Sequence, residues 1–396
     1  MLAAPVAKFM AAGDDAARQA LLTPLFTPSA TCSLEATAET QSYLVLSCLE
    51  NVVTQCRFWK YVDGEFTLEQ TVGSEVGLSP SFSAVDAEGS DALWVTSSGY
   101  TQPTTLALAD ASTPAKTEAL KALPAQYDAS KVRTQQFYAT SADGTEVPYF
   151  LVSSTETPLD GSTPTLLYGY GGFEISLTPG YSAGIGAAWL EKGYAYVQAN
   201  IRGGGEYGPR WHQAALKENR NKAFEDFEAV AKDLIARGVT TPAKLGCQGG
   251  SNGGLLTGNM LSRPTAGSEL FGAIVCQVPL LDMKRFNLLL AGASWMGEYG
   301  NPDVPEEWAY LQKYSPYHNV DAATDYPPIL ITTSTRDDRV HPAHARKLVG
   351  KLLGLGKAES TYYYENIEGG HGGAANNKQR AFMSTLAYDF LAQKLG

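Results

Sequence analysis

Apolar and polar residues alternate in short segments over the first 110 residues of the chain. β-Branched and aromatic side chains recur there at every second position, and this period favours strands over helices. Turn signals such as Asp63-Gly64 and Glu88-Gly89-Ser90 separate the segments. The strands expected from this pattern are residues 42–47, 57–62, 66–72, 93–97 and 104–109. The pattern predicts antiparallel meanders, such as propeller blades or part of a sandwich.

The pattern changes beyond residue 110. Residues 111–131 are rich in Ala, Lys, Pro and Thr and are interpreted as a connector. A hairpin is predicted for residues 135–153, with its turn at Ala142-Asp143-Gly144. From about Thr163, short apolar runs typical of buried parallel strands alternate with helical segments. The strands expected there are residues 166–168, 195–199, 245–247, 273–278, 329–333 and 361–364.

The helical segments carry apolar residues three and four positions apart. The apolar positions of residues 223–237 are Phe224, Phe227, Val230, Ala231 and Leu234. Gly238 is a plausible end of this helix, and residues 342–353 and 378–395 show the same period. Alternating strands and helices predict an α/β fold with a mostly parallel sheet, whose ligands bind beyond the carboxyl ends of the strands.

Composition narrows the class of protein. With 396 residues and 44% hydrophobic residues, the chain is long enough for two domains and can bury a substantial core. The net charge is −11 and no cluster of Lys and Arg is present, so neither nucleic acid nor an anionic membrane is expected as a partner. No apolar run reaches the ~20 residues of a membrane span.

The cysteines and the N-terminus bear on location. Five cysteines, an odd number without CxxC pairs, indicate neither a disulfide framework nor a thiolate zinc site. The first ten residues lack the basic segment of a signal peptide. We therefore expect a reducing, cytoplasmic location.

The segment from Gly249 to Gly254 carries the first sign of chemistry. It contains Gly-x-Ser-x-Gly with Ser251 at its centre. An apolar run, residues 243–247, precedes it, and a helical segment, residues 255–261, follows. Strand, sharp turn and helix are the context of a nucleophile elbow. The six residues alone fit a glycine-rich loop with an incidental serine equally well.

Other residues decide between these readings. A serine hydroxyl becomes nucleophilic when a base, usually His, takes its proton and a carboxylate orients that base. In α/β-hydrolases the chain order is Ser, then Asp or Glu, then His. His371 follows the last expected strand and stands among glycines. The acid should follow residues 329–333, where Asp337 and Asp338 both qualify.

An oxyanion formed at such a serine needs preorganised donors. One is expected from the backbone N–H of Asn252, the next residue, and another from the glycine-rich loop of residues 169–173. No Gly-Lys-Ser/Thr follows that loop, which argues against a phosphate cradle. His341 and His344 lack the HExxH pattern, so neither a metal nor a cofactor is expected.

Five ordered motifs resemble the prolyl oligopeptidase family, serine peptidase family S9. They are Leu167-Tyr168-Gly169-Tyr170-Gly171-Gly172-Phe173, Asn200-Ile201-Arg202-Gly203-Gly204-Gly205-Glu206-Tyr207-Gly208, Gly249 to Gly254, Asp337-Asp338-Arg339-Val340 and Gly370-His371-Gly372. Their order and spacing over residues 130 to 396 are those of the family. The resemblance implies an α/β-hydrolase fold for a peptidase domain of residues 126–396.

The resemblance also implies roles for single residues. The triad it implies is Ser251, Asp337 and His371. It makes the Tyr170 hydroxyl an oxyanion donor beside Asn252, and it makes Arg339 the ligand of a substrate carbonyl. The residues that it places around the substrate proline are Phe173, Trp295, Tyr299 and Val340. A pocket of aromatic and aliphatic walls with one directed polar contact suits a rigid ring without an N–H.

Residues 1–125 depart from the family pattern. Family members usually carry a seven-bladed propeller, and this segment resembles only its last blades. We therefore expect a partial β-propeller-like segment before the peptidase domain. Whether the chain is a truncated form of a longer protein, and what its oligomeric state is, are left open by the residues.

The function predicted from these features is a serine-type oligopeptidase. It would cleave short proline-containing peptides on the carboxyl side of proline through an acyl-enzyme. One alternative is a serine esterase or a related oligopeptidase of other specificity, because a triad does not dictate an amide substrate. Another is a non-catalytic remnant that acts as an interaction module.

Overall fold

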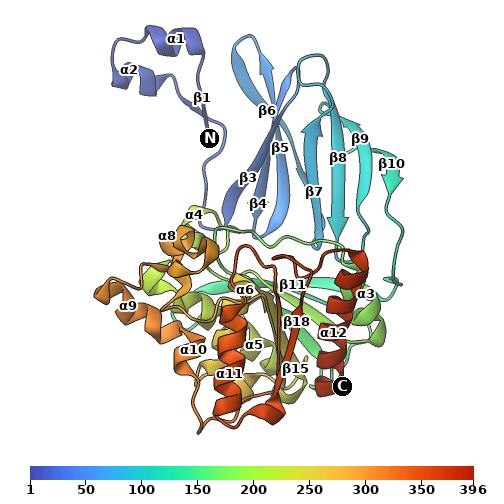
Figure 1. The fold of residues 1–396 in the computed structure, drawn as a ribbon. Coiled ribbons are helices and arrows are strands. Elements are labelled where there is room, and N and C mark those ends of the chain that lie inside the picture. The colour runs from blue at the N-terminus through green and yellow to red at the C-terminus, as the bar shows by residue number, and fades with distance from the viewer. The chain divides into compact units, whose positions relative to one another are not determined.

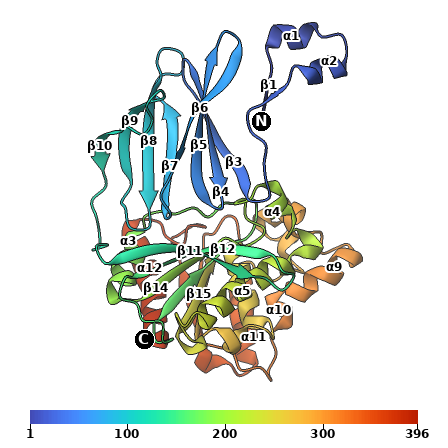
Figure 2. The same ribbon diagram turned by 180° about the vertical axis from the view of Figure 1, so that it is seen from behind.

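The computed structural model describes residues 1–396, which fold into two compact units. Unit 1 comprises Met1–Ala125, Thr178–Tyr181 and Glu206–Gly208. Unit 2 comprises Gln126–Leu177, Ser182–Gly205 and Pro209–Gly396. Figures 1 and 2 show the chain from opposite sides.

Unit 1 is built mainly from two four-stranded antiparallel sheets (Figure 1). The first holds β3 (Cys32–Glu39), β4 (Tyr43–Glu50), β5 (Val53–Val62) and β6 (Glu65–Gly73). The second holds β7 (Leu78–Ala84), β8 (Ala92–Gly99), β9 (Thr105–Asp110) and β10 (Glu118–Ala122). In each sheet consecutive strands are neighbours, so the predicted meanders are confirmed. The turn at Asp63 and Gly64 has φ values of 50° and 91°, as a type I′ hairpin requires.

Two parts of unit 1 differ from the sequence expectations. Strand β10 lies inside the segment interpreted as a connector; all five of its side chains are exposed, so it lacks the apolar alternation that marks a strand. Near the N-terminus, α1 (Val6–Ala11) and α2 (Asp15–Ala20) lie between the short paired strands β1 (Leu2–Ala3) and β2 (Thr23–Pro24). None of these four elements was expected, because each is too short to show a period.

Side chains of both sheets form a shared core in unit 1. Its buried members are Tyr43, Val45, Cys56, Phe58, Leu93 and Ala111. Phe58 of the first sheet meets Phe82 of the second edge to face, with ring centroids 5.5 Å apart. The two sheets are therefore held together by apolar packing between their facing sides.

Unit 2 contains one eight-stranded sheet in the order β11-β12-β14-β13-β15-β16-β17-β18. Its strands are β11 (Val132–Thr140), β12 (Glu146–Ser154), β13 (Thr165–Tyr168), β14 (Ala195–Ala199), β15 (Leu245–Gly250), β16 (Ala273–Gln277), β17 (Ile329–Ser334) and β18 (Thr361–Asn366). The first two form the predicted hairpin, and β12 is antiparallel to β14. All other pairings are parallel, as the short apolar runs predicted.

Helices cover both faces of this sheet (Figure 1). Those against one face are α5 (Asn221–Ala236), α6 (Asn252–Ser262) and α11 (Ala343–Gly354), and those against the other are α3 (Ala183–Ala188) and α12 (Asn377–Leu395). Shorter helices lie in the loops: α4 (Pro209–Gln213), α7 (Gly267–Leu270), α8 (Met296–Tyr299), α9 (Pro305–Leu311) and α10 (Pro316–Asn319). Helix α5 buries the apolar stripe that predicted it, with Phe224, Phe227 and Leu234 fully enclosed. The predicted α/β fold is confirmed.

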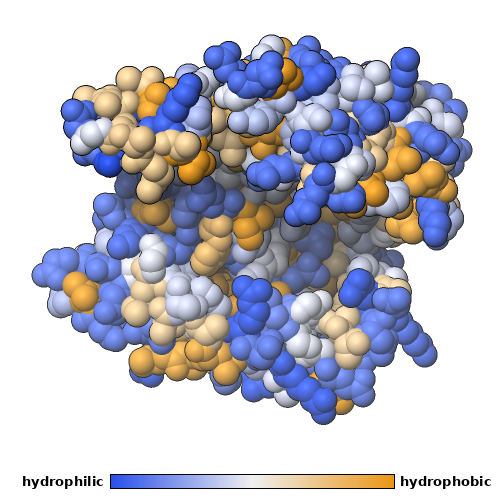
Figure 3. All heavy atoms as spheres, turned by 90° about the horizontal axis from the view of Figure 1, so that it is seen from above, coloured by the Kyte–Doolittle hydropathy of each residue, from blue (hydrophilic) through white to orange (hydrophobic).

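The surface carries polar and apolar side chains together. Figure 3 shows hydrophilic residues spread over one face, with hydrophobic residues in small groups among them. No helix combines the length and apolarity needed to cross a bilayer. All five cysteines are buried free thiols, and no group of three or more His, Cys, Asp or Glu side chains is arranged to hold a metal ion.

One buried histidine makes the stability of unit 2 sensitive to pH. His344 in α11 is 1% exposed, and its Nδ1 accepts the N–H groups of Leu281 and Asp282 at 3.3 and 3.1 Å. Burial lowers the pKa of His344 to about 4, because an enclosed imidazolium loses its hydration. The ring is therefore neutral in the folded chain at neutral pH.

This burial predicts a stability loss in mild acid. The folded-state pKa lies below the ordinary value, so the unfolded chain binds the proton first as the pH falls. The contribution of neutral His344 is complete above about pH 6.5 and is lost as the pH falls toward about 4. Between pH 7.5 and 5 the loss amounts to about 2 kcal/mol.

We expect the free energy of unfolding of the His344→Asn variant to fall by about 2 kcal/mol less than that of the wild type over this interval. Asn retains an acceptor oxygen for the two backbone N–H groups but cannot be protonated. Urea denaturation at both pH values measures the difference. Equal losses in the two proteins would contradict the assignment.

Candidate active site

Ser251 lies at the junction of β15 and α6 in a strained conformation. Its φ and ψ are 60° and −115°, a region that residues with a side chain rarely adopt and that costs of the order of 1–3 kcal/mol. The Ser251 N–H donates to the carbonyl of Gln277 at 2.9 Å, and its carbonyl accepts from the first turn of α6. The strand and the helix therefore hold the serine in the sharp turn that the glycine pattern predicted.

The flanking glycines are required by close backbone approach. A Cβ on Gly249 would lie 2.3 Å from the carbonyl oxygen of Gly253, and one on Gly254 would lie 2.6 Å from the Cα of Pro279. Both distances are shorter than any normal van der Waals contact. The glycines at 249 and 254 thus permit the tight turn that places Ser251 beyond the carboxyl end of β15.

Asp337 and His371 meet at the same edge of the sheet. Asp337 follows β17 and is 4% exposed. Its Oδ1 accepts the N–H groups of Arg339 and Val340, both at 2.9 Å, which fixes the carboxylate. The Nδ1 of His371 lies 2.8 Å from Oδ2 and 3.0 Å from Oδ1 of Asp337. With Nδ1 committed in this way, Nε2 is the ring nitrogen left for proton transfer.

The structure distinguishes between Asp337 and Asp338, which both qualified by position as the carboxylate that orients the histidine. Asp338 is exposed, whereas Asp337 is buried and its carboxylate is hydrogen-bonded to the histidine ring. Ser251 and His371 come from neighbouring parts of this edge but are not hydrogen-bonded to each other in this structure. Hydrogen bonds of this kind often tighten only when a substrate is bound.

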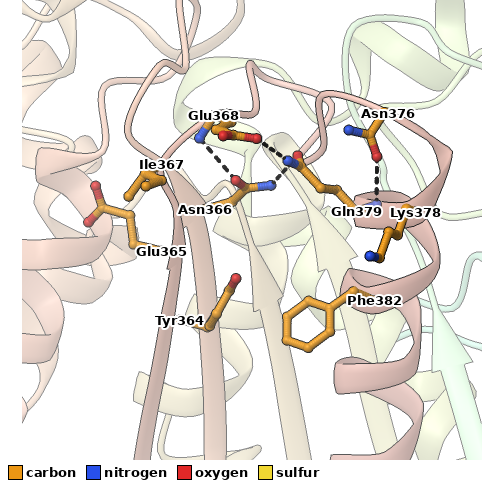
Figure 4. A pocket seen from close by; sticks show the side chains of 9 residues that line it. All are labelled: Tyr364, Glu365, Asn366, Ile367, Glu368, Asn376, Lys378, Gln379 and Phe382. Carbon is orange, nitrogen blue, oxygen red and sulfur yellow. Dashed lines mark hydrogen bonds between the residues drawn. The ribbon is translucent and has the colours of Figure 1, made fainter.

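Asn366 braces the loop that carries His371. It stands at the end of β18, and its Nδ2 donates to the carbonyl of Gly373 and to the Oε1 of Gln379, both at 3.0 Å. Its Oδ1 accepts the N–H of Glu368 at 3.0 Å. Figure 4 shows Asn366 turned toward Gln379 of α12 and Glu368, beside a surface cavity of about 560 Å³. An Asn before a glycine-rich loop was the only sequence signal for this role.

A second cavity of about 240 Å³ opens beside Ser251. It is lined by Tyr170, Phe173, Ile175, Ser251, Asn252, Leu280, Ser294, Trp295, Tyr299, Arg339 and Val340. All five residues expected around the substrate are among them. Sequence reasoning missed Ile175, Leu280 and Ser294, which belong to no motif and reach the cavity through the folding of their loops.

Aromatic packing shapes one wall of this cavity. Phe173 and Tyr299 meet edge to face with ring centroids 5.7 Å apart, and Phe286 supports Tyr299 from behind at 5.6 Å. Tyr299 is fully buried, so its ring cannot swing into solvent. Trp295 ends the short 3₁₀ segment Leu290–Trp295 just before α8 and lines the cavity half-buried. The result is an apolar slot with rigid sides.

Tyr170 faces the elbow in the protonated form. Burial raises the pKa of its hydroxyl, although Arg339 and Arg220 act in the opposite direction and a hydrogen bond with Ser251 adds to their effect. A protonated phenol can donate a hydrogen bond. Tyr170 and Asn252 both line the cavity beside Ser251.

Comparisons with known proteins place the chain among peptidases. The model of the prolyl oligopeptidase family matches residues 181–396. An uncharacterized peptidase of Sinorhizobium fredii is 50% identical over 94% of this chain and 50% of its own length. A prolyl endopeptidase of Elizabethkingia miricola is 37% identical over 71% of this chain and 40% of its own length.

Solved structures agree with the sequence comparisons. The structure of a post-proline cleaving enzyme from Rickettsia typhi superposes with a TM-score of 0.84 at 35% identity, covering 95% of this chain and 53% of that chain. The chain thus spans about half the length of the relatives it matches. Because the family model covers more than half of its residues, the chain belongs to the prolyl oligopeptidase family.

Proposed function

We propose that this chain is a serine peptidase that cleaves short peptides on the carboxyl side of proline. The observation that carries the proposal is the aromatic cavity directly beside Ser251. The names of the related prolyl endopeptidases and the post-proline cleaving enzyme support the same substrate class. Residues 1–125 are proposed as a partial propeller-like domain and residues 126–396 as the peptidase domain. Cytoplasmic location stays a prediction.

In the proposed mechanism, the Oγ of Ser251 attacks the prolyl carbonyl carbon while the Nε2 of His371 takes its proton. Asp337 holds the ring through Nδ1 and stabilises the imidazolium. The negative oxygen of the tetrahedral intermediate receives hydrogen bonds from the Asn252 N–H and the Tyr170 hydroxyl. His371 then protonates the departing amine, which leaves the acyl group on Ser251.

Hydrolysis of the acyl-enzyme repeats the same steps with water. His371 takes a proton from the water as it attacks the ester carbon, and returns it to the Oγ of Ser251 when the peptide acid leaves. The same donors stabilise the second tetrahedral intermediate. Both half-reactions therefore use one set of side chains, and no cofactor enters either of them.

Selectivity for proline follows from the cavity walls. The ring of proline is compact, rigid and apolar, and proline has no N–H to satisfy, so Phe173, Trp295 and Tyr299 can enclose it without leaving a buried donor unpaired. Arg339, exposed and part of the cavity lining, is proposed to bind a carbonyl of the substrate peptide. No Asp or Glu lines this cavity, which disfavours cleavage after basic residues.

The first test is hydrolysis of a peptide with proline before a chromogenic amide. We expect the wild type to release the chromophore and Ser251→Ala to lose at least about 10⁴-fold in kcat, because no other group can form the acyl-enzyme. Ser262 lies at the C-terminal end of α6, the helix that follows Ser251. The Ser262→Ala variant serves as the control and should retain activity. Absence of wild-type release, or undiminished release by Ser251→Ala, would refute the proposal.

Trp295 tests the assignment of the pocket. The Trp295→Ala substitution should lower kcat/KM for the proline peptide about 10- to 100-fold, since a large apolar contact with the substrate is lost. The ratio of proline to alanine cleavage should fall in parallel. Trp308→Ala is the matched control, because Trp308 packs against the same core but does not line the cavity. If Trp295→Ala keeps the wild-type proline preference, as Trp308→Ala is expected to do, Trp295 has no part in specificity.

The wild type and the Trp295→Ala variant also test the alternative that the chain is a serine esterase. A carboxylesterase would hydrolyse short-chain aryl esters faster than prolyl amides and would be insensitive to Trp295→Ala. An interaction module without catalysis would hydrolyse neither.

A further inference from the structure

A buried ion pair lies behind the candidate active site without lining its cavity. Arg220, at the start of α5, is 1% exposed, and Glu298, in α8, is 6% exposed. The Nη1 of Arg220 lies 2.8 Å from the Oε1 of Glu298. Two charges removed from water in this way are held only by good mutual geometry and further hydrogen bonds.

The further hydrogen bonds lead directly to the residues of the elbow and the oxyanion loop. Arg220 donates through Nη2 to the Oδ1 of Asn252. The Nδ2 of Asn252 donates to the carbonyl of Tyr170 at 2.6 Å. The Oε1 of Glu298 accepts the N–H of Phe173 at 3.0 Å. The pair therefore contacts the residue after Ser251 on one side and the loop of Tyr170 and Phe173 on the other.

Three outer contacts complete this set. The hydroxyl of Tyr299 donates to the same Oδ1 of Asn252 at 2.8 Å. The Arg220 guanidinium lies over the Tyr299 ring, 5.4 Å from its centroid. His212 of α4 reaches the Oε2 of Glu298 at 2.7 Å. Every polar atom of the Asn252 amide group is thus committed to a partner from another segment of the chain.

Gly172 shows how closely the loop is pressed onto these side chains. A Cβ at this position would lie 2.5 Å from the Nδ2 of Asn252 and 3.0 Å from the Nη2 of Arg220. The φ of Gly172 is not in the left-handed region, so its backbone conformation is open to any residue. Glycine is needed here because the network leaves no room for a side chain.

We propose that Arg220 is a positioning residue: with Glu298 it locks Asn252 and the Tyr170–Phe173 loop together, so that the oxyanion donors and the wall of the proline pocket are set by one buried network. This inference rests on the proposed function. Arg220 does not line the cavity beside Ser251. It acts through Asn252 and Tyr170 on the oxyanion side and through Phe173 and Tyr299 on the pocket side.

The geometry requires a guanidinium at this position. Arg220 bonds to Glu298 with one terminal nitrogen and to Asn252 with the other, and its flat face covers the ring of Tyr299. A lysine ammonium is a point charge that cannot span the two acceptors in one plane while covering a ring. Arg220→Lys therefore retains the charge for Glu298 but releases Asn252.

The chain supplies a matched control for this substitution. Arg263 also pairs with a buried glutamate, Glu228 at 2.6 Å, bonds to an asparagine oxygen, that of Asn221 at 3.1 Å, and lies over an aromatic ring, that of Phe224 at 5.8 Å. None of these residues lines the cavity beside Ser251. Arg263→Lys thus removes the same kinds of contact elsewhere in unit 2.

The experiment measures kcat and KM for the proline peptide and for its alanine counterpart, below the unfolding temperature of every variant. For Arg220→Lys we expect kcat on the proline peptide to fall about 10- to 100-fold with KM changed less than about threefold, because oxyanion contacts act mainly in the transition state. The proline-to-alanine ratio of kcat/KM should also fall. Arg263→Lys should keep both values within about twofold of the wild type.

Two further variants cover the case in which Arg220→Lys fails to fold. Gly172→Ala disturbs the same contacts by crowding and removes no charge, and Glu298→Gln keeps the shape of the acceptor. Both should reproduce the loss in kcat. Wild-type kcat and proline preference in folded Arg220→Lys, Gly172→Ala and Glu298→Gln would overturn the inference, as would an equal loss in Arg263→Lys.

Failure of the positioning role and failure of the proposed function give different results. If the wild type does not cleave the proline peptide, the proposed function has failed. If the wild type cleaves it and the Arg220, Gly172 and Glu298 variants match the wild type, only the positioning role has failed.

Discussion

The positive φ of Ser251 is the constraint on which the rest of the site depends. A residue with a side chain is held there only because β15 and α6 are both fixed, one by the parallel sheet and the other by packing against it. Strict parallel pairing from β15 to β18 then brings the residues that follow these strands to one edge. Asp337 and His371 reach the neighbourhood of the serine from that edge because the sheet leaves their loops no other direction.

A buried ion pair is the second feature that holds the residues around Ser251. The pair of Arg220 and Glu298 is costly to enclose, and a pair of this kind adds little to stability compared with apolar packing. In the proposed positioning role its value lies in direction, since its hydrogen bonds tie Asn252 and Phe173 to one pair of side chains. Tyr299 also packs edge to face against Phe173 and Phe286, and these contacts hold the aromatic wall of the pocket.

Local patterns in the sequence were sufficient for the sheet and the helix α5, whereas the elbow also needed Asp337 and His371 in the right chain order. The choice between Asp337 and Asp338 was not local: it needed the family resemblance, and the hydrogen bonds of the folded chain agree with it. Arg220 and Glu298 were missed altogether, because their partners are 32 to 125 residues distant and no motif records such pairing. Strand β10 was not predicted because its five side chains are all exposed, so its sequence shows no alternation of apolar and polar residues.

The proposed peptidase activity depends on Ser251 being an activated nucleophile in the folded chain. A fluorophosphonate probe forms a covalent bond with such a serine, and mass spectrometry of the digested protein locates the bond. We expect a single labelled site at Ser251, with labelling abolished by His371→Ala and by prior unfolding in urea. No labelling of the folded wild-type protein, or labelling at another residue, would contradict it.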